Sequence, residues 1–195
     1  MKKGIIIPSE FQGQRTGTLF FTTIKFLLVA FLIALPFKLF VAQPFVVSGV
    51  SMVPTFIDGE YLVIDKVTYR YKKPQRGDII IFEYPLDPSY YFIKRVVALP
   101  GETITIDGAH VEVTDQNGAS KMLDEPYISS TNPKKDVSRI TLAKDEYFVL
   151  GDNRDESSDS REWGPLQEKF IVGRALISMY PLDHAGFLPG KFPSQ

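Results

Sequence analysis

The sequence is organised around one irregular stretch, which reads SGVSMVPT over residues 48–55. It follows a long apolar segment and precedes short runs rich in β-branched and aromatic residues. Ser51 stands between Gly49 and Pro54, in a stretch that neither a helix nor a central strand accommodates. A serine on such a turn can present its hydroxyl to a cleft, as a nucleophile must. The alternative is an ordinary turn serine, and the rest of the chain bears on that choice.

The composition excludes several classes of protein and of catalytic site. The chain has 195 residues and a formal net charge of -1, so nothing in it favours nucleic-acid binding. Cysteine is absent, which rules out disulfides, cysteine-based metal sites and a cysteine nucleophile. There are two histidines. His110 follows a hairpin signal and His184 lies in a Pro/Gly-rich tail, so each is expected at the surface. If Ser51 is a nucleophile, its base is therefore expected to be a residue other than histidine.

The amino-terminal segment predicts a basic cytoplasmic tail followed by a membrane anchor. Residues 1–18 carry Lys2, Lys3 and Arg15, whereas residues 19–42 are dominated by Phe, Leu, Ile, Val and Ala. A bilayer span needs about 20 apolar residues, which this segment supplies. The basic tail predicts a cytoplasmic amino terminus, with the remainder exported to the outer side of the membrane. A cleaved signal peptide would require a small-x-small site close behind the apolar core, and a buried core helix has no obvious place in a β-rich remainder.

Residues 43–195 predict an extracytoplasmic domain of mostly antiparallel β structure. About 150 residues of this kind are enough to bury a core. Asp107-Gly108 is a strong hairpin signal, and residues 102–145 are expected to form a small β insertion. Its polar part, residues 119–140, predicts a loop or a weak strand. We expect strands at residues 60–65, 67–71, 78–84, 90–99, 103–107, 110–114, 146–150 and 171–180.

A lysine in one of these strands is a candidate general base. Alternate side chains of a strand share a face, so either Lys94 or Arg95 must point toward a largely apolar side. Burial disfavours the ammonium form and lowers the pKa of a lysine, whereas arginine keeps its proton. A neutral Lys94 amine placed against Ser51 could accept the hydroxyl proton. The alternative is an edge-strand lysine that extends its ammonium to solvent.

The second polar stretch of interest reads GDNRDESSDSR over residues 151–161. Its carboxylates could suggest Ca²⁺ or Mg²⁺. However, Arg154 and Arg161 lie among the acids and no EF-hand spacing is present, so ion pairs and turn caps are expected instead of a metal site. Ser157 or Ser158 could offer a hydroxyl that orients a buried lysine amine.

Taken together, four stretches in this order make the chain resemble the type I signal peptidases, also called leader peptidases. They are residues 48–55, residues 76–82 (RGDIIIF), residues 94–101 (KRVVALPG) and residues 151–161 followed by Trp163-Gly164. The resemblance implies a membrane-anchored Ser/Lys-dyad serine endopeptidase that removes signal peptides from exported preproteins. It further implies a catalytic domain folded as a coiled antiparallel β-barrel, one transmembrane helix, and no metal or organic cofactor.

The same resemblance assigns roles to individual residues. Ser51 is then the nucleophile and Lys94 the general base. Ser157 would help to orient the lysine, and Asp159 and Arg161 would form a structural ion pair near the site. An extended substrate would pair with residues 45–48 and with the strand before Lys94, adding as a strand, with small residues such as Ala-x-Ala before the cut. The expected substrate-binding positions are Phe45, Val47, Gly49, Met52, Phe92 and Ile93.

Gly49 marks one departure from part of the family. Some relatives place a serine there whose hydroxyl binds the oxyanion, so here the backbone N–H of Ser51 and a further donor would be needed. The expected partners are signal peptides of secreted preproteins and membrane lipid. Two alternatives remain: another Ser/Lys processing peptidase of the same fold, and a non-catalytic membrane-anchored β module that binds partners. A self-cleaving repressor would need a DNA-binding domain that residues 1–47 cannot form, and a binding module gives no reason for the motifs to occur together.

Overall fold

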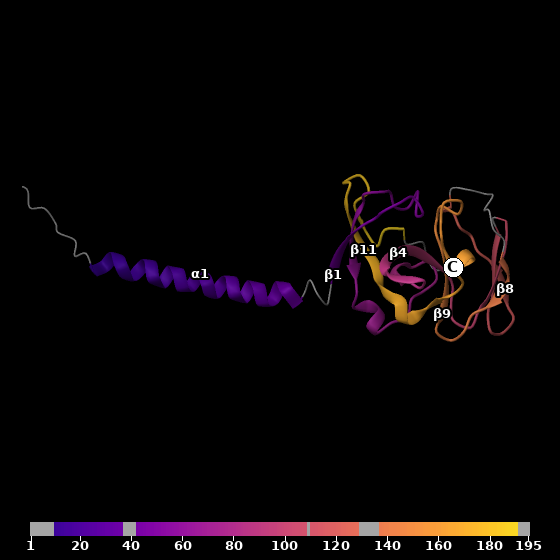
Figure 1. The fold of residues 1–195 in the computed structure, drawn as a ribbon, viewed down its shortest axis with the longest axis horizontal. Helices are drawn as coiled ribbons and strands as arrows, with labels where there is room; N and C mark the ends of the chain where they lie inside the picture. Colours follow the sequence, from indigo (N-terminus) through magenta and orange to yellow (C-terminus); the bar gives the residue numbers. More distant parts are fainter. Residues whose placement is uncertain (1–9, 37–41, 109, 129–136, 191–195) are drawn as a thin grey trace, which may run out of the picture. The chain divides into compact units, whose positions relative to one another are not determined.

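The computed structural model describes residues 10–36, 42–108, 110–128 and 137–190. The chain divides into two compact units, residues 1–41 and residues 42–195 (Figure 1). The first unit contains helix α1 (Glu10–Pro36) and the second contains all the strands. Each unit is described by itself below.

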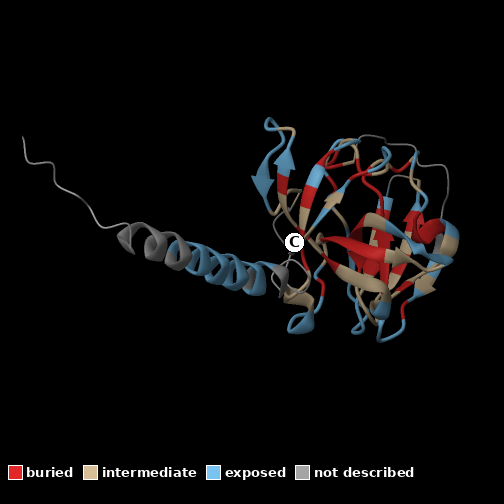
Figure 2. Ribbon diagram, turned by 60° about the vertical axis from the view of Figure 1, so that its left-hand side comes forward, coloured by how far each residue is buried: buried red, intermediate tan, exposed pale blue. Residues whose placement is uncertain are grey.

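Helix α1 has 27 residues and ends at Pro36, where the proline ring removes a backbone donor. The helix begins at Glu10, inside the segment expected to be a basic tail, and Ala42, at the end of the expected anchor, belongs to strand β1 (Ala42–Val46). The limits of the tail, the anchor and the extracytoplasmic domain stay predictions. Large apolar side chains from Leu19 to Leu32 are exposed (Figure 2). No helix in the described part of the chain has the length and hydropathy needed to cross a bilayer. The predicted transmembrane anchor is therefore not confirmed, and residues 1–9 and 37–41 lie outside the described segments.

The second unit confirms the prediction of mostly antiparallel β structure. Its larger sheet has eight strands in the order β1-β2-β11-β3-β4-β9-β10, with β12 paired to β11. Strands far apart in the sequence are therefore neighbours, for example β2 with β11 and β4 with β9. The strands of this sheet are β1 (Ala42–Val46), β2 (Tyr61–Asp65), β3 (Ile79–Tyr84), β4 (Asp87–Ala98), β9 (Glu146–Leu150), β10 (Leu166–Gln167), β11 (Ile171–Tyr180) and β12 (Gly186–Phe187).

The smaller sheet is the predicted insertion. Its four strands follow the order β7-β6-β5-β8. The predicted hairpin at Asp107-Gly108 is present, with Asp107 paired to His110 and Gly108 at a φ of 57°, which glycine adopts readily. Two short strands occupy part of the segment predicted to be loop or weak strand. The strands of the smaller sheet are β5 (Thr103–Asp107), β6 (His110–Thr114), β7 (Ser120–Met122) and β8 (Val137–Thr141).

One predicted strand is wrong: residues 67–71 contain the 3₁₀ helix η2 (Thr68–Arg70). The carboxylate of Asp65 accepts hydrogen bonds from the backbone N–H groups of Val67 at 2.9 Å and of Thr68 at 3.0 Å. Such a side-chain acceptor turns the backbone away from an extended course and opens a helical turn. Two other short helices are α2 (Ser160–Trp163) and η3 (Glu168–Phe170).

Strand β3 shows why the large sheet is buried on both faces. Its residues 79–82 are all buried. Because neighbouring side chains point to opposite faces, Ile79 and Ile81 join one apolar cluster with Met52, whereas Ile80 and Phe82 join another. Figure 2 shows the buried residues concentrated in the strands of this unit. Adjacent residues of the next strand, β4, are consequently buried as well.

Candidate active site

Ser51 lies in the loop between β1 and β2, and local contacts hold that loop in place. Gly49 adopts a φ of 94° and its N–H donates to Asp58 Oδ1 at 2.7 Å. This left-handed conformation suits glycine because it has no Cβ. Met52 is 1% exposed and packs in the core, and its carbonyl accepts a hydrogen bond from Phe56 at 2.9 Å. Ser51, the neighbour of this buried methionine, is thus kept near the surface and is half-buried.

The structure brings Lys94 of β4 to this serine. Lys94 Nζ donates to Ser51 Oγ at 2.7 Å and to the carbonyl of Ile93 at 2.9 Å. The lysine is only 4% exposed, and its Nζ lies 5.3 Å from the centre of the Phe92 ring. The alternative in which the ammonium extends to solvent is therefore wrong. Arg95 is 0% exposed, so Lys94 and Arg95 are both buried, whereas strand alternation required this of only one of them.

Burial lowers the pKa of Lys94 to about 8, and the nearby Arg161 adds to that effect. The carboxylates of Asp159 and Asp152 oppose it. Both acids are already held by arginines, because Arg161 pairs with Asp159 and Arg95 pairs with Asp152. Within the described β unit, no carboxylate lies at ion-pair distance from the lysine amine. A substantial fraction of the amine is therefore neutral near pH 8, which is the form that can accept a proton.

The segment that follows β9 packs directly on the backbone of Ser51. The backbone N–H of Asn153 donates to the Ser51 carbonyl at 3.0 Å, and its side-chain amide donates to the Val50 carbonyl at 3.1 Å. Gly151 approaches so closely that a Cβ there would lie 2.5 Å from the Ser51 carbonyl oxygen. The 151–161 stretch and the 48–55 stretch thus form one joined structure.

The predicted ion pair between Asp159 and Arg161 is present and buried. Arg161 Nε donates to Oδ1 and Nη2 to Oδ2, each at 2.8 Å. Asp159 also caps helix α2 and accepts a hydrogen bond from the Gly151 N–H at 3.1 Å. Arg161 Nη2 donates in addition to the carbonyl of Arg154 at 2.7 Å. The pair therefore holds the turn that carries Gly151 against Ser51.

A cleft of about 380 Å³ opens at the hydroxyl–amine pair. Strands β1 and β4 supply much of its apolar wall, and the rings of Phe45 and Tyr91 meet edge to face at 5.3 Å. Five of the six predicted substrate-binding residues line the cleft, namely Phe45, Val47, Gly49, Phe92 and Ile93. Met52 does not; it lies in the core and is nearly without exposed surface.

A family model described as "Signal peptidase, peptidase S26" matches residues 20–180. The chain belongs to this signal peptidase family. "Probable signal peptidase I-1" of Synechocystis sp. is 38% identical over 193 residues, which cover 95% of this chain and 92% of that protein. "Signal peptidase I" of Leptolyngbya laminosa is 36% identical over 88% of this chain and 84% of its own length. A crystal structure of a signal peptidase I from Enterococcus faecalis V583 is 33% identical, covers 53% of this chain and 97% of that one, and has a TM-score of 0.44.

In this signal peptidase the structure does not join Ser157 to the lysine by a hydrogen bond. Ser157 Oγ is buried and has no hydrogen-bond partner among the described residues. It lies beside Gly151, where a Cβ would come within 2.3 Å of it. Ser158, the other candidate, lines the cleft and donates to Glu162 Oε2 at 2.7 Å. The orienting role of Ser157 remains a prediction.

Several residues of the signal peptidase cleft were missed from the sequence. Ile81 lines the cleft because β3 and β4 pair in a register that sets it opposite Ile93. No local pattern encodes that register. Val46, Ser48, Tyr90 and Tyr91 also line the cleft; they lie in the two segments, residues 45–48 and the strand before Lys94, that were expected to pair with the substrate. Ser158 was expected only as a residue that could orient the lysine, and the other missed lining residues are Val50, Leu62 and Glu156.

The acidic residues offer no metal centre in the part of this signal peptidase that the structure describes. No group of three or more His, Asp or Glu side chains there could hold a metal ion. Asp152 and Asp159, the two buried acids of the 151–161 stretch, are bound by arginines as expected from the sequence.

Proposed function

We propose that this signal peptidase removes signal peptides from exported preproteins with Ser51 as nucleophile and Lys94 as general base. The observation that carries the proposal is the 2.7 Å hydrogen bond between Lys94 Nζ and Ser51 Oγ at the wall of the cleft. A buried lysine without a carboxylate partner is suited to this role, because its pKa is lowered to about 8. Arginine in its place could not exchange a proton.

The proposed reaction has two stages. The neutral amine of Lys94 takes the proton of Ser51 as Oγ attacks the scissile carbonyl carbon. The resulting ammonium then gives that proton to the departing amine, which leaves an ester between Ser51 and the signal peptide. In the second stage the same amine takes a proton from water, and the hydroxide formed attacks the ester. The proton returns to Ser51 Oγ as the ester bond breaks, so the enzyme regains its starting form.

The developing oxyanion needs hydrogen-bond donors. The N–H of Ser51 makes no backbone hydrogen bond to any described residue outside the regular elements, which supports its use as one donor. Gly49 contributes no side-chain hydroxyl, so a second donor has to come from elsewhere. Asn153 donates a hydrogen bond to the carbonyl of Ser51 and Gly151 packs close to it, so the peptide unit that follows the nucleophile is held rigidly.

The strand pairing supports binding of an extended substrate between β1 and β4. Strand β1 is at the end of the larger sheet and pairs with β2. Strand β4 pairs with β9 from Arg95 onward, so the described residues leave the preceding part of that edge without a strand partner. A substrate strand can use these edges, with alternate side chains in the apolar cleft. The proposal places small residues such as alanine before the cut, with larger side chains rejected by steric exclusion.

Attachment to the outer face of a bacterial cytoplasmic membrane is part of the proposal. The described part of α1 does not reach a full span by itself, so this step draws on the apolar sequence of residues 19–42 as a whole. Exposed side chains such as Phe26 and Leu32 support contact with lipid. Lys2, Lys3 and Arg15 favour a cytoplasmic amino terminus. Protease treatment of intact spheroplasts should digest residues 43–195 and spare an amino-terminal tag.

The activity is tested with purified full-length protein in detergent and a synthetic precursor peptide that carries Ala-x-Ala before the expected cut. Mass spectrometry should find one cut after the second alanine. Ser51→Ala and Lys94→Ala should each abolish this cut while the circular dichroism spectrum stays that of a β protein. Full activity of either variant would contradict the assigned roles.

A further inference from the structure

Residues 123–128 form a loop segment that follows β7 of the smaller sheet and contacts the segments that meet at the active site. Glu125 and Tyr127 lie in this loop, between β7 and β8. We propose that Glu125 and Tyr127 are positioning residues for the reaction: together they hold the 151–154 turn and strand β4 in the arrangement that sets Lys94 against Ser51. This inference rests on the proposed function of the pair. It gives the small insertion a role in catalysis without contact to substrate.

The loop buries polar groups that a surface loop would normally leave in water. Glu125 and Tyr127 are each 9% exposed, whereas Asp124 and Pro126 beside them are exposed. Burial of a carboxylate and a phenol is unfavourable unless both find hydrogen-bond partners. The inward-facing residues of this loop therefore have defined contacts, and those contacts identify what the loop holds.

The first contact holds the turn behind Ser51. Glu125 Oε1 accepts hydrogen bonds from Arg154 Nη2 at 2.5 Å and from the Tyr127 hydroxyl at 2.7 Å. Arg154 Nε in turn donates to the carbonyl of Gly151 at 3.1 Å. Gly151 is the residue whose Cα packs against the Ser51 carbonyl. One carboxylate of the insertion thus acts on the nucleophile backbone through a single arginine.

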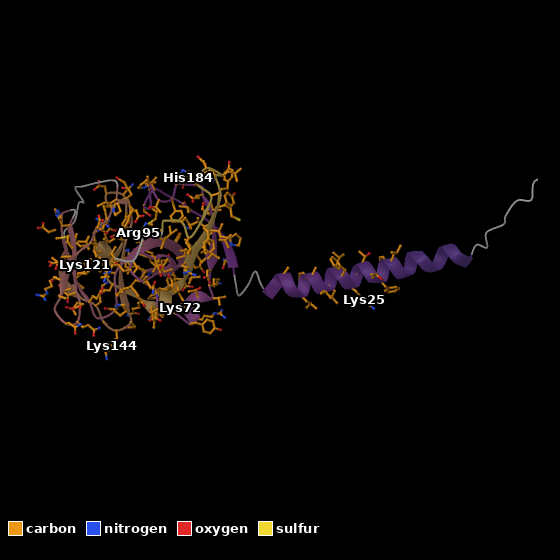
Figure 3. The ribbon with its side chains drawn as sticks, turned by 180° about the vertical axis from the view of Figure 1, so that it is seen from behind. Lys25, Lys72, Arg95, Lys121, Lys144 and His184 are labelled. Atoms are coloured by element: carbon orange, nitrogen blue, oxygen red, sulfur yellow. The ribbon has the colours of Figure 1, made fainter. Side chains whose placement is uncertain are left out.

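The second contact holds the strand that carries the base. The guanidinium of Arg95 lies 3.9 Å from the centre of the Tyr127 ring. Arg95, which directly follows Lys94, is labelled inside the β unit in Figure 3. Its Nε donates to Asp152 Oδ1 at 2.8 Å. A cation over an aromatic face is stabilised by the electrostatics of the ring, so Tyr127 holds the guanidinium of Arg95 in addition to the carboxylate of Asp152.

The two contacts converge on three consecutive residues. Gly151 is reached through Arg154, Asp152 is held by Arg95, and the N–H of Asn153 donates to Ser51. A shift of the loop would therefore change the Ser51 and Lys94 sides together. Misplacement of reacting groups by about 1 Å can cost about 10²-fold in rate.

Stability alone is a poor explanation of this arrangement. Glu125 Oε2 and Arg154 Nη1 are buried and have no hydrogen-bond partner among the described residues. A buried ion pair with unsatisfied atoms adds little to folding stability compared with apolar residues of the same volume. The Glu125–Arg154 pair instead fixes the positions of the groups that it contacts, and this is useful next to the Ser51–Lys94 dyad.

The test compares three variants of the full-length enzyme with the same precursor peptide. Tyr127→Leu removes the ring over Arg95, Glu125→Gln removes the charge that holds Arg154, and Tyr127→Phe keeps the ring. The matched control is Ile106→Val, a buried position of the same small sheet with an apolar side chain. Melting temperature, kcat, KM and the pH dependence of kcat/KM are measured for each protein.

We expect Tyr127→Leu and Glu125→Gln to lower kcat per folded molecule by about tenfold or more, with KM changed less than kcat. The acid limb of their pH profiles should move, because the surroundings of Lys94 change. Tyr127→Phe should retain most of the activity, and Ile106→Val should lower only the melting temperature. Folded Tyr127→Leu and Glu125→Gln proteins with wild-type kcat and pH profile would overturn the inference. If wild-type enzyme itself does not cut the peptide, the proposed function has failed instead.

Discussion

Lys94 of strand β4 and Ser51 of the β1–β2 loop share a 2.7 Å hydrogen bond across 43 positions of the chain. The amine is buried, and its two nearest buried acids are held by Arg95 and Arg161. The hydroxyl is consequently its main polar partner besides one backbone carbonyl. This relationship makes the charged lysine unfavourable in the folded protein and leads to the predictions below.

Lys94→Met should abolish cleavage and raise folding stability at pH 7. Lowering the lysine pKa from 10.5 to about 8 corresponds to about 3 kcal/mol that the folded protein loses by holding this cation. The folded form binds fewer protons than the unfolded form between these two values, so wild-type stability rises with pH across that window. The advantage of the variant should therefore shrink from pH 8 toward pH 10.5.

Urea unfolding at pH 7 and pH 10 measures this difference. The exposed Lys144, labelled in Figure 3, gives the matched control Lys144→Met, which should change stability little at either pH. A Lys94→Met protein that is less stable than wild type at both values would show that the buried ammonium is not destabilising.

The rate of cleavage should rise with pH and reach half of its plateau near pH 8. Only the neutral amine of Lys94 can take the proton of Ser51, and its lowered pKa is about 8. Below that value kcat/KM should fall by about tenfold for each pH unit. Lys94→Arg should be inactive at every pH, because the guanidinium keeps its charge. A rate that does not change between pH 5 and pH 9 would argue against a titrating lysine base.

Gly151→Ala should lower kcat by about 10²-fold, because displacement of a reacting group by about 1 Å has that effect. The added Cβ would lie 2.3 Å from Ser157 Oγ and 2.5 Å from the Ser51 carbonyl oxygen, so the nucleophile backbone has to move. Gly186→Ala is the matched control, since nothing lies within 4 Å of a Cβ at that position. Kinetics with the precursor peptide check both variants, and equal kcat values for the two would refute the close packing inferred here.

Arg161→Lys should destabilise the protein by about 1–3 kcal/mol, because a buried charge then loses part of its hydrogen bonding. A lysine cannot reproduce the two parallel bonds to Asp159 together with the bond to the Arg154 carbonyl. Thermal or urea unfolding measures the loss. The exposed Arg139 provides the control substitution Arg139→Lys, for which we expect no change. Equal stability of the two variants would mean that the bidentate geometry is unimportant.

Much of the β unit and of its chemistry was predictable from the sequence. The Asp107-Gly108 turn predicted its hairpin, and the apolar run at residues 79–82 lies in the strand predicted at residues 78–84. The motifs around Ser51 and Lys94 and the 151–161 stretch predicted the participants of the site. These features are local, since turn geometry and side-chain alternation depend on neighbouring residues.

Other features depend on particular side-chain contacts, some of them local and others between segments that are distant in the sequence. Val67 and Thr68 were predicted to be in a strand, but the side chain of Asp65 binds their N–H groups and turns the chain. Met52 was assigned to the pockets by the family resemblance, whereas packing draws it into the core. Glu125 contacts Arg154, and Tyr127 contacts Arg95. These contacts join the segment after β7 to residues outside the smaller sheet, and no sequence pattern indicates them.

By itself, therefore, the sequence determined most of the longer strands, the main turns and the kinds of group available for catalysis. Only the tertiary structure decided that Lys94 is buried, that arginines take its neighbouring carboxylates, and that its amine meets Ser51. The physical reason is that a pKa and a hydrogen bond depend on which atoms exclude water from a group. Here the groups around the Lys94 amine come from β4, the 48–55 loop and the 151–161 stretch, which the chain brings together only when the sheet forms.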